Sequence, residues 1–169
     1  MTEVVLELSV RDLLRADLES CGWSGSDLHL ADVAEQLVRA GRGEVDYLAV
    51  CTPTDVPVAK AGVDYRAAAG AGTIWQLAVH PALQSCGIGT LLVGAAEQRI
   101  RGRGLRRAEL AVEEDNPRAR ALYERLGYVA YDRRPDAWDE RAPDGSLRRY
   151  ETMCTLLRKE LPPGADRSG

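Results

Sequence analysis

Two glycines, Gly87 and Gly89, give one short run of this sequence the composition of a main-chain anion site. They follow a strand-like segment that ends at His80-Pro81, and they open a segment with helical periodicity. Glycine lets the backbone approach an anion without a Cβ in the way. The first amides of a helix lack intrahelical acceptors, and the helix dipole favours negative charge there. This pattern indicates a site for a phosphate or pyrophosphate.

Two common nucleotide motifs do not fit this run. A P-loop requires GxxxxGK[ST], but Leu92 stands where the second glycine would be and no lysine follows it. A dinucleotide fingerprint requires GxGxxG, which also needs a glycine at position 92. The remaining pattern is Gln-x-x-Gly-x-Gly after a strand. On this pattern alone, a glycine-rich helix start without a ligand stays an equal alternative.

A second segment, residues 116–128, adds candidate chemistry. Asn116 and Pro117 have the types preferred at the N-cap and first position of a helix, and Gly127 has the type preferred just after the end. Tyr123 lies on the apolar face of this helix. Taken alone, Tyr123 is a core tyrosine with a satisfied hydroxyl.

Together the two segments resemble the GCN5-related N-acetyltransferase (GNAT) family. The matching runs are 77–81, 84–92 and 116–128, and the strand expected at 107–112 fits between them. The resemblance is specific across residues 73–131. It implies an α/β (α+β) fold: a mixed central sheet of about seven strands, flanked by about four helices, with splayed central strands. We expect one domain over residues 1–161 and a flexible tail over residues 162–169.

The resemblance also implies acetyl-CoA as cofactor and assigns roles to residues. The backbone of Leu77, Ala78 and Val79 would meet the pantetheine arm and the thioester. The pyrophosphate would bind Gln84, Ser85, Cys86, Gly87, Ile88, Gly89 and Thr90, with Asn116 and Arg118 as further cofactor contacts. Tyr123 would lie near the sulfur and protonate the leaving thiolate.

The residue that removes the proton from the acceptor amine is the weakest part of the pattern. The family often has an acid near the positions of Trp75 and Gln76, and this chain has none there. Glu113 is the single candidate base that we select, against the alternative that Glu113, Glu114 and Asp115 are solvated loop charges. Candidate acceptor-binding residues are Trp23, His29, Trp75 and Trp138.

The function predicted from this resemblance is N-acetyl transfer. The acetyl group would pass from acetyl-CoA to a primary amine of a small molecule or a peptide by direct attack, through a tetrahedral intermediate. A non-catalytic acyl-CoA-binding sensor of the same fold is the alternative. A transferase that modifies aminoacylated nucleic acid is a third possibility, which the acidic charge balance disfavours. The acceptor and the oligomeric state, monomer or homodimer, stay open.

Periodicity predicts the elements that must position these residues. We expect strands over 4–10, 47–51, 56–65, 73–79, 107–112, 128–131 and 150–157, and helices over 13–21, 27–41, 88–102 and 117–126. The segment 132–149 is rich in charges of both signs around the turn signal Pro143-Asp144-Gly145.

Composition sets the outer limits. The 169 residues carry 22 Lys and Arg against 26 Asp and Glu, a formal net charge of −4, which disfavours a dedicated nucleic-acid binder. The four cysteines are widely spaced, so we expect neither a metal site nor a disulfide framework. The sequence has no signal-peptide pattern and no apolar run of about 20 residues, which favours a cytoplasmic protein without membrane contact.

Overall fold

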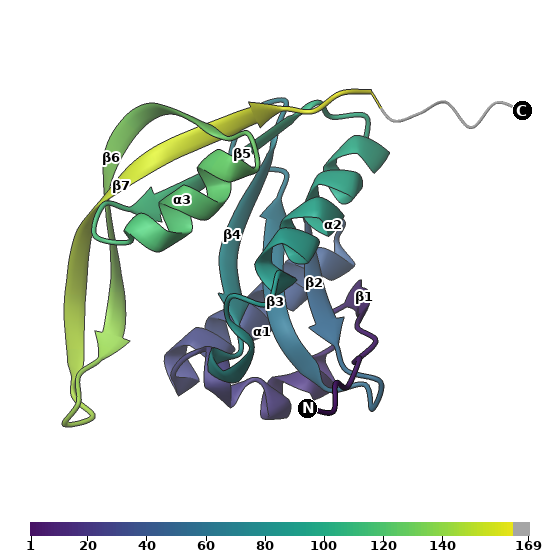
Figure 1. Ribbon diagram of the computed structural model, residues 1–169. Helices are drawn as coiled ribbons and strands as arrows, with labels where there is room; N and C mark the ends of the chain where they lie inside the picture. The colour runs from purple at the N-terminus through teal and green to yellow at the C-terminus, as the bar shows by residue number, and fades with distance from the viewer. Residues whose placement is uncertain (164–169) are drawn as a thin grey trace, which may run out of the picture. The chain divides into compact units, whose positions relative to one another are not determined.

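A computed structural model describes residues 1–163 of the chain (Figure 1). Its strands are β1 Ser9–Asp12, β2 Val45–Cys51, β3 Pro57–Asp64, β4 Gly72–Val79, β5 Arg107–Glu113, β6 Val129–Arg141 and β7 Leu147–Glu160. The α-helices are α1 Asp27–Gly41, α2 Ile88–Gly102 and α3 Pro117–Arg125. Short 3-10 helices are η1 Arg15–Ser20, η2 Gly22–Ser24 and η3 Pro81–Leu83.

The strands form one mixed sheet in the order β1-β2-β3-β4-β5-β7-β6. β4 and β5 are parallel and pair at Gly72–Ile74 with Ala108–Leu110, which covers only the beginning of β4. β1 is antiparallel to β2, and β7 is antiparallel to both β5 and β6. The predicted fold class, a seven-stranded mixed sheet with helices, is therefore confirmed.

The chain divides into two compact units. Unit 1 contains Met1–Gly62 and Gln76–Ala96, and unit 2 contains Val63–Trp75 and the chain from Glu97 onward. β3, β4 and α2 contribute residues to both units. The single domain over residues 1–161 stays a prediction. Of the predicted tail over 162–169, the first two residues lie in no helix or strand, and residues 164–169 lie outside the described part.

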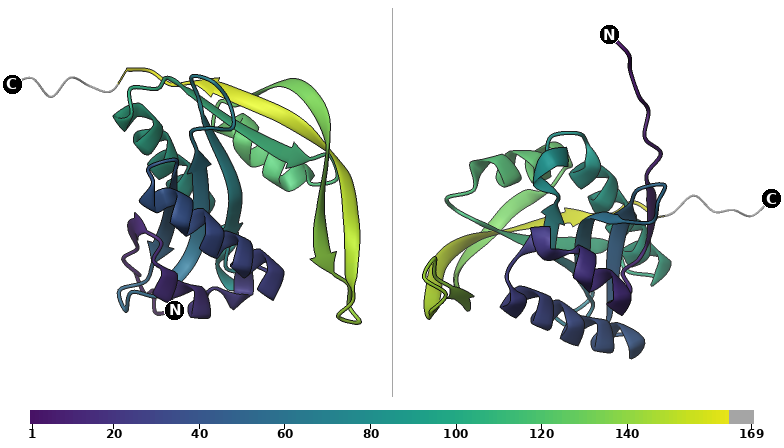
Figure 2. Two further views of the ribbon diagram at one scale, coloured as in Figure 1. Left: turned by 180° about the vertical axis from the view of Figure 1, so that it is seen from behind. Right: turned by 90° about the horizontal axis from the view of Figure 1, so that it is seen from below.

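In unit 1, helices cover both faces of the strands. α1 and the beginning of α2 lie on opposite sides of β2 and β3, as the front and rear views show (Figures 1 and 2). Every residue of β2 except Asp46 is buried, which explains why the strand has a nearly continuous apolar run instead of an alternating one. α1 begins at the cap Ser26, whose hydroxyl accepts a hydrogen bond from His29 N–H.

In unit 2, α3 lies on one face of the sheet formed by β5, β7 and β6 (Figure 1). The charged segment over 132–149 belongs to the long antiparallel pair of β6 and β7, and residues 142–146 form the turn between the two strands. Beneath α2, Tyr128 and Lys159 donate to the buried carboxylate of Glu97, at 3.0 and 2.9 Å. The ammonium compensates a charge that burial would otherwise make costly.

Two predicted elements differ from the structure at the N-terminus. The alternating run over 4–10 predicts a strand, but β1 begins only at Ser9, and Val4 and Val5 are 83% and 84% exposed. Ser9 pairs with Cys51, the last residue of β2, so residues before Ser9 have no strand to pair with there. The helix predicted over 13–21 is the shorter 3-10 helix η1.

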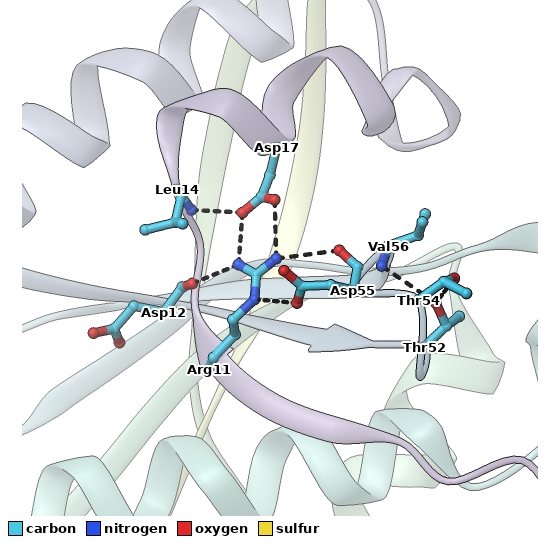
Figure 3. Close-up of polar contacts among 8 residues, drawn as sticks. All are labelled: Arg11, Asp12, Leu14, Asp17, Thr52, Thr54, Asp55 and Val56. Atoms are coloured by element: carbon cyan, nitrogen blue, oxygen red, sulfur yellow. Dashed lines mark hydrogen bonds and ion pairs between the residues drawn. The ribbon is translucent and has the colours of Figure 1, made fainter.

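Arg11 fastens the end of β1 to its surroundings (Figure 3). Its guanidinium contacts the carboxylates of Asp17 at 2.7 Å and Asp55 at 2.8 Å. Hydrogen bonding from Arg11 holds the pKa of Asp17 below its usual range. We expect Arg11→Met to lower the free energy of unfolding by about 1–2 kcal/mol, since charge-assisted hydrogen bonds are lost at a partly exposed site. Urea unfolding at pH 7 measures this, and an unchanged midpoint would contradict it.

Candidate functional site

The glycine turn of unit 1 joins β4 to α2. Ser85 and Gly87 both have left-handed backbone angles, with φ of 62° and 82°. The first helical bond runs from Leu91 N–H to the Gly87 carbonyl at 3.1 Å. The N–H groups of Ile88, Gly89 and Thr90 therefore precede the hydrogen-bond ladder of α2. Residues 84–87 are exposed. The turn thus leaves the first amides of α2 without helical acceptors beside an exposed loop, an arrangement that favours an anion.

Two hydrogen bonds hold the end of β4 in place. His80 N–H donates to the Val58 carbonyl at 2.8 Å, and the Gln84 amide donates to the Val79 carbonyl at 3.4 Å. The predicted cofactor residues Leu77, Ala78 and Val79 are partly exposed. These bonds fix the direction in which the chain leaves the strand toward the turn.

Gln76 has a φ of 54° in the middle of β4, an unusual backbone angle for a residue other than glycine. Its side chain is held at both ends: it accepts from the Tyr47 hydroxyl at 2.9 Å and donates to an Asp32 carboxylate oxygen at 2.5 Å. Strained backbone persists where the surroundings hold it, and such positions are concentrated at functional sites. The irregularity lies directly before the predicted cofactor strand residues.

A buried polar chain continues from Tyr47 across the strands to α1. Lys60 on β3 is completely buried, at 0% exposure. Its Nζ lies 3.2 Å from the Tyr47 hydroxyl and 2.8 Å from Nε2 of His29. The chain therefore runs from His29 through Lys60 and Tyr47 to Gln76. His29 was predicted from the sequence and Lys60 was not, although a lysine within the apolar run of β3 was a signal for it.

Burial changes the protonation of this chain. It lowers the pKa of Lys60 to about 8, an effect that Cys21 and Asp32 partly oppose. It also lowers the pKa of His29 to about 4, and the neighbouring Lys60 contributes to this shift. Burial raises the pKa of the Tyr47 hydroxyl, so that it stays protonated. At neutral pH the imidazole is neutral, and the ammonium is close to losing its proton.

Replacing Lys60 is expected to stabilise the protein. A lysine whose pKa is lowered on folding costs stability below the folded pKa near 8, and the cost disappears as the pH rises toward the unfolded value of about 10.4. We expect Lys60→Met to raise the free energy of unfolding by on the order of 2 kcal/mol at pH 7. Urea unfolding at pH 7 and pH 10 measures the gain, which should shrink at the higher pH. Destabilisation at pH 7 would contradict this.

Trp23, in unit 1, carries a buried polar group beside His80, the residue that follows β4. Its indole packs against the His80 ring, with centroids 5.6 Å apart. The indole N–H is buried without a hydrogen-bond acceptor among the described residues. A buried donor without a partner is costly, so this N–H calls for an acceptor that the described residues do not supply. This fits the predicted role of Trp23 toward the acceptor, which stays a prediction.

Tyr123 on α3, in unit 2, also has a polar group without a hydrogen-bond partner among the described residues. Its ring is 8% exposed and packs edge-on against Tyr128, with centroids 6.1 Å apart. Within residues 1–163 its hydroxyl has no hydrogen-bond partner, unlike the expectation for a core tyrosine. Burial raises the pKa of this hydroxyl, which keeps it protonated and able to donate. Tyr123 therefore has the protonation state that a general acid needs.

Asn116 and Arg118 lie at the beginning of α3. The Asn116 side-chain oxygen accepts from Ala119 N–H at 3.1 Å, so its first role is that of the predicted helix cap. Both side chains are exposed. Their predicted cofactor contacts stay predictions, with the amide NH2 of Asn116 as the group left to make one.

Glu113 ends β5 within a small cluster of unit 2. Its carboxylate accepts a hydrogen bond from the Tyr150 hydroxyl at 2.8 Å, and the Tyr150 ring packs against Trp138 at 4.8 Å between centroids. Tyr150 was not predicted from the sequence, because no motif marks it. Its neighbour Glu114 instead pairs with Arg133, as expected for a surface charge. The structure thus brings Glu113 and Trp138 together through Tyr150. Trp75, another predicted acceptor contact, lies on a different strand, β4.

The predicted site residues fall into two sets. Unit 1 carries those of the turn and the β4 end, together with Trp23 and His29. Unit 2 carries Trp75, Glu113, Asn116, Arg118, Tyr123 and Trp138. Each set has the geometry described above within its own unit.

A model of the acetyltransferase (GNAT) family matches residues 9–128. The chain belongs to this family. Among curated GNAT relatives, the mycothiol acetyltransferase of Beutenbergia cavernae is 47% identical over 61 residues, which is 36% of this chain and 20% of that protein. The chain thus spans about a fifth of the length of this relative.

Solved GNAT structures share the fold. The ribosomal-protein-S18-alanine N-acetyltransferase of Escherichia coli has a TM-score of 0.67 at 18% identity, over 96% of this chain and 99% of that one. The spermidine N-acetyltransferase of Vibrio cholerae, solved with CoA and spermine, has a TM-score of 0.70 at 16% identity, over 92% and 98%. At these identities the likeness shows the GNAT fold alone.

Proposed function

We propose that this protein transfers an acetyl group from acetyl-CoA to a primary amine of a small molecule or a peptide. The observation that carries the proposal is the exposed turn at Gly87, which presents the first amides of α2 where the family motif places the pyrophosphate. Family membership and the CoA bound in the Vibrio cholerae structure support it. Acetyl-CoA supplies an activated acyl group as a thioester.

Unit 1 supplies the binding groups in this proposal. The N–H groups of Ile88, Gly89 and Thr90 hold the pyrophosphate, so a net charge of −4 is no obstacle to binding an anion. The backbone of Leu77 to Val79 orients the pantetheine arm and the thioester. A main-chain N–H held in place there stabilises negative charge on the carbonyl oxygen as the amine attacks.

Unit 2 supplies the acid. Tyr123 donates its proton to the departing sulfur, and the partnerless hydroxyl leaves that proton available. Glu113, the base candidate predicted from the sequence, accepts a hydrogen bond from Tyr150 that orients its carboxylate. Trp23, His29, Trp75 and Trp138 are the proposed acceptor contacts.

Within residues 1–163, no helix has the length and apolar character needed to span a membrane.

The second candidate function is a non-catalytic acyl-CoA sensor. The absence of an acid at Trp75 and Gln76 favours it, whereas the protonated Tyr123 hydroxyl favours an enzyme. Calorimetry with acetyl-CoA tests binding, and CoA release with propylamine, spermidine, an alanine N-terminal peptide and a lysine peptide tests transfer. We expect both. Binding without release on the whole panel would favour the sensor, and absence of binding would overturn both functions.

A further inference from the structure

Lys60 is buried, and no residue among 1–163 gives it an anionic partner. The chain has two lysines, Lys60 and Lys159, and Lys159 pairs with Glu97. Lys60 instead meets two uncharged groups, the His29 imidazole and the Tyr47 hydroxyl, with no carboxylate at ion-pair distance among the described residues. Burying an unpaired ammonium opposes folding. Its place in the core of β3 therefore calls for a reason other than stability.

His29 connects this buried amine to the surface. The imidazole is partly exposed, and its Nε2 faces Lys60 at 2.8 Å. Its Nδ1 has no hydrogen-bond partner within residues 1–163. Gly25 makes room for the ring, because a Cβ there would lie 2.8 Å from His29 Cδ2. One ring nitrogen thus contacts the buried amine, and the other is left for a molecule from outside the chain.

The row of hydrogen-bonded side chains that begins at His29 ends on β4. Tyr47 links Lys60 at 3.2 Å to the side chain of Gln76 at 2.9 Å, directly before Leu77. In the proposed function, residues 77–79 hold the thioester that the amine attacks. The polar chain is therefore anchored on the same strand, and within the same unit, as the groups that would orient the acyl carbon.

We propose that Lys60 receives, through His29, the proton that the acceptor amine must lose. This inference rests on the proposed acetyl transfer. Before the step, Lys60 is a neutral amine and His29 carries its hydrogen on Nε2. The acceptor ammonium gives one proton to Nδ1, and the Nε2 proton passes to the Lys60 nitrogen. The acceptor nitrogen keeps the freed electron pair for attack, and Lys60 becomes an ammonium that donates to Nε2.

The groups packed around the chain set its titration. Asp32 on α1 raises the pKa of both His29 and Lys60, and Cys21, between η1 and η2, raises that of Lys60. Tyr47 on β2 stays protonated. Burial outweighs these two influences and lowers the pKa of Lys60 to about 8, within reach of ordinary assay conditions.

A direct titration tests the protonation of Lys60 without any substrate. Lys159→Arg keeps the cation beside Glu97 and leaves Lys60 as the only lysine. In this variant, carbon-13 NMR of the labelled lysine Cε follows one signal from pH 6 to pH 11. We expect a midpoint near pH 8. A midpoint above 10, as in an exposed lysine, would overturn the proposal, because the amine would then always be charged.

Kinetics with the best amine of the panel test the role. We expect kcat/KM to rise with pH to a plateau above about 8 in the wild type and in Lys159→Arg. Lys60→Met and His29→Gln should lower kcat/KM at pH 8.5 by about 100-fold and remove this limb. Tyr47→Phe removes a hydrogen-bond acceptor from the Lys60 ammonium and should lower the pKa of Lys60. The rise of kcat/KM with pH should therefore move to lower pH in this variant, which a purely structural role would not produce.

The outcomes separate this inference from the function beneath it. An unchanged pH profile in Lys60→Met, with wild-type turnover present, overturns the role of Lys60 and leaves acetyl transfer standing. Loss of the limb in Glu113→Gln, with the limb retained in Lys60→Met, assigns the base to Glu113 and also overturns it. CoA binding without release by the wild type overturns the proposed function and this inference with it.

Discussion

Gly87→Val is expected to weaken acetyl-CoA binding about 100-fold. Gly87 has a φ of 82°, and a β-branched residue adopts such an angle only with strain of about 1–3 kcal/mol. A Cβ at this position would meet nothing within 4 Å, so the obstacle is backbone conformation and not space. The turn would relax and carry the amides of Ile88 and Gly89 away from the phosphates, each lost bond to a charged group costing a further 1.5–3 kcal/mol or so. Calorimetry with acetyl-CoA measures the dissociation constant.

A matched control separates strain from binding. Gly43, just beyond α1 in unit 1, has a φ of 73° and also has open space around its Cβ position. Gly43→Val should lower the melting temperature about as much as Gly87→Val and leave the dissociation constant unchanged. Equal affinity in the wild type and Gly87→Val would remove the turn from the cofactor site.

The glycine turn between β4 and α2 was predictable because its signal is local. A strand end, two glycines and a helix start occupy consecutive positions, and backbone amides need no distant partner to face an anion. Asn116 as the cap of α3 was predictable for the same reason. Both features follow from residue type and spacing within a few positions of the chain.

Lys60 and Tyr150 were not predictable because their partners are distant in sequence. Lys60 meets His29 from 31 positions away, and Tyr150 meets Glu113 from 37 positions away. The packing of α1 on the strands determines the first contact, and the pairing of β5 with β7 determines the second. Periodicity encodes neither of them. Register also explains the error at the N-terminus, since the run over 4–10 alternates like a strand, yet its residues before Ser9 lie beyond the end of β2.

The remaining large effect concerns Tyr123. We expect Tyr123→Phe to lower kcat by about 10- to 100-fold, which is at or below the lower end of the contribution of about 100- to 10,000-fold that is usual for a positioned acid. The hydroxyl has no partner within residues 1–163, so removing it breaks no hydrogen bond of the fold. The ring and its packing against Tyr128 stay. Acetyl-CoA affinity should therefore stay within about twofold, because the lost interaction forms only as the sulfur leaves. Steady-state CoA release and calorimetry measure the two quantities.

Tyr128→Phe is the control for this variant, since it deletes a phenol hydroxyl from the neighbouring ring. That hydroxyl donates to buried Glu97 at 3.0 Å, so its loss should lower the free energy of unfolding by about 1–3 kcal/mol and leave kcat unchanged. The two variants should therefore have opposite effects: Tyr123→Phe lowers turnover and Tyr128→Phe lowers stability. An unaltered kcat in Tyr123→Phe would exclude Tyr123 as the acid. A loss of kcat equal in both variants would show that packing, and not proton donation, is what the ring of Tyr123 contributes.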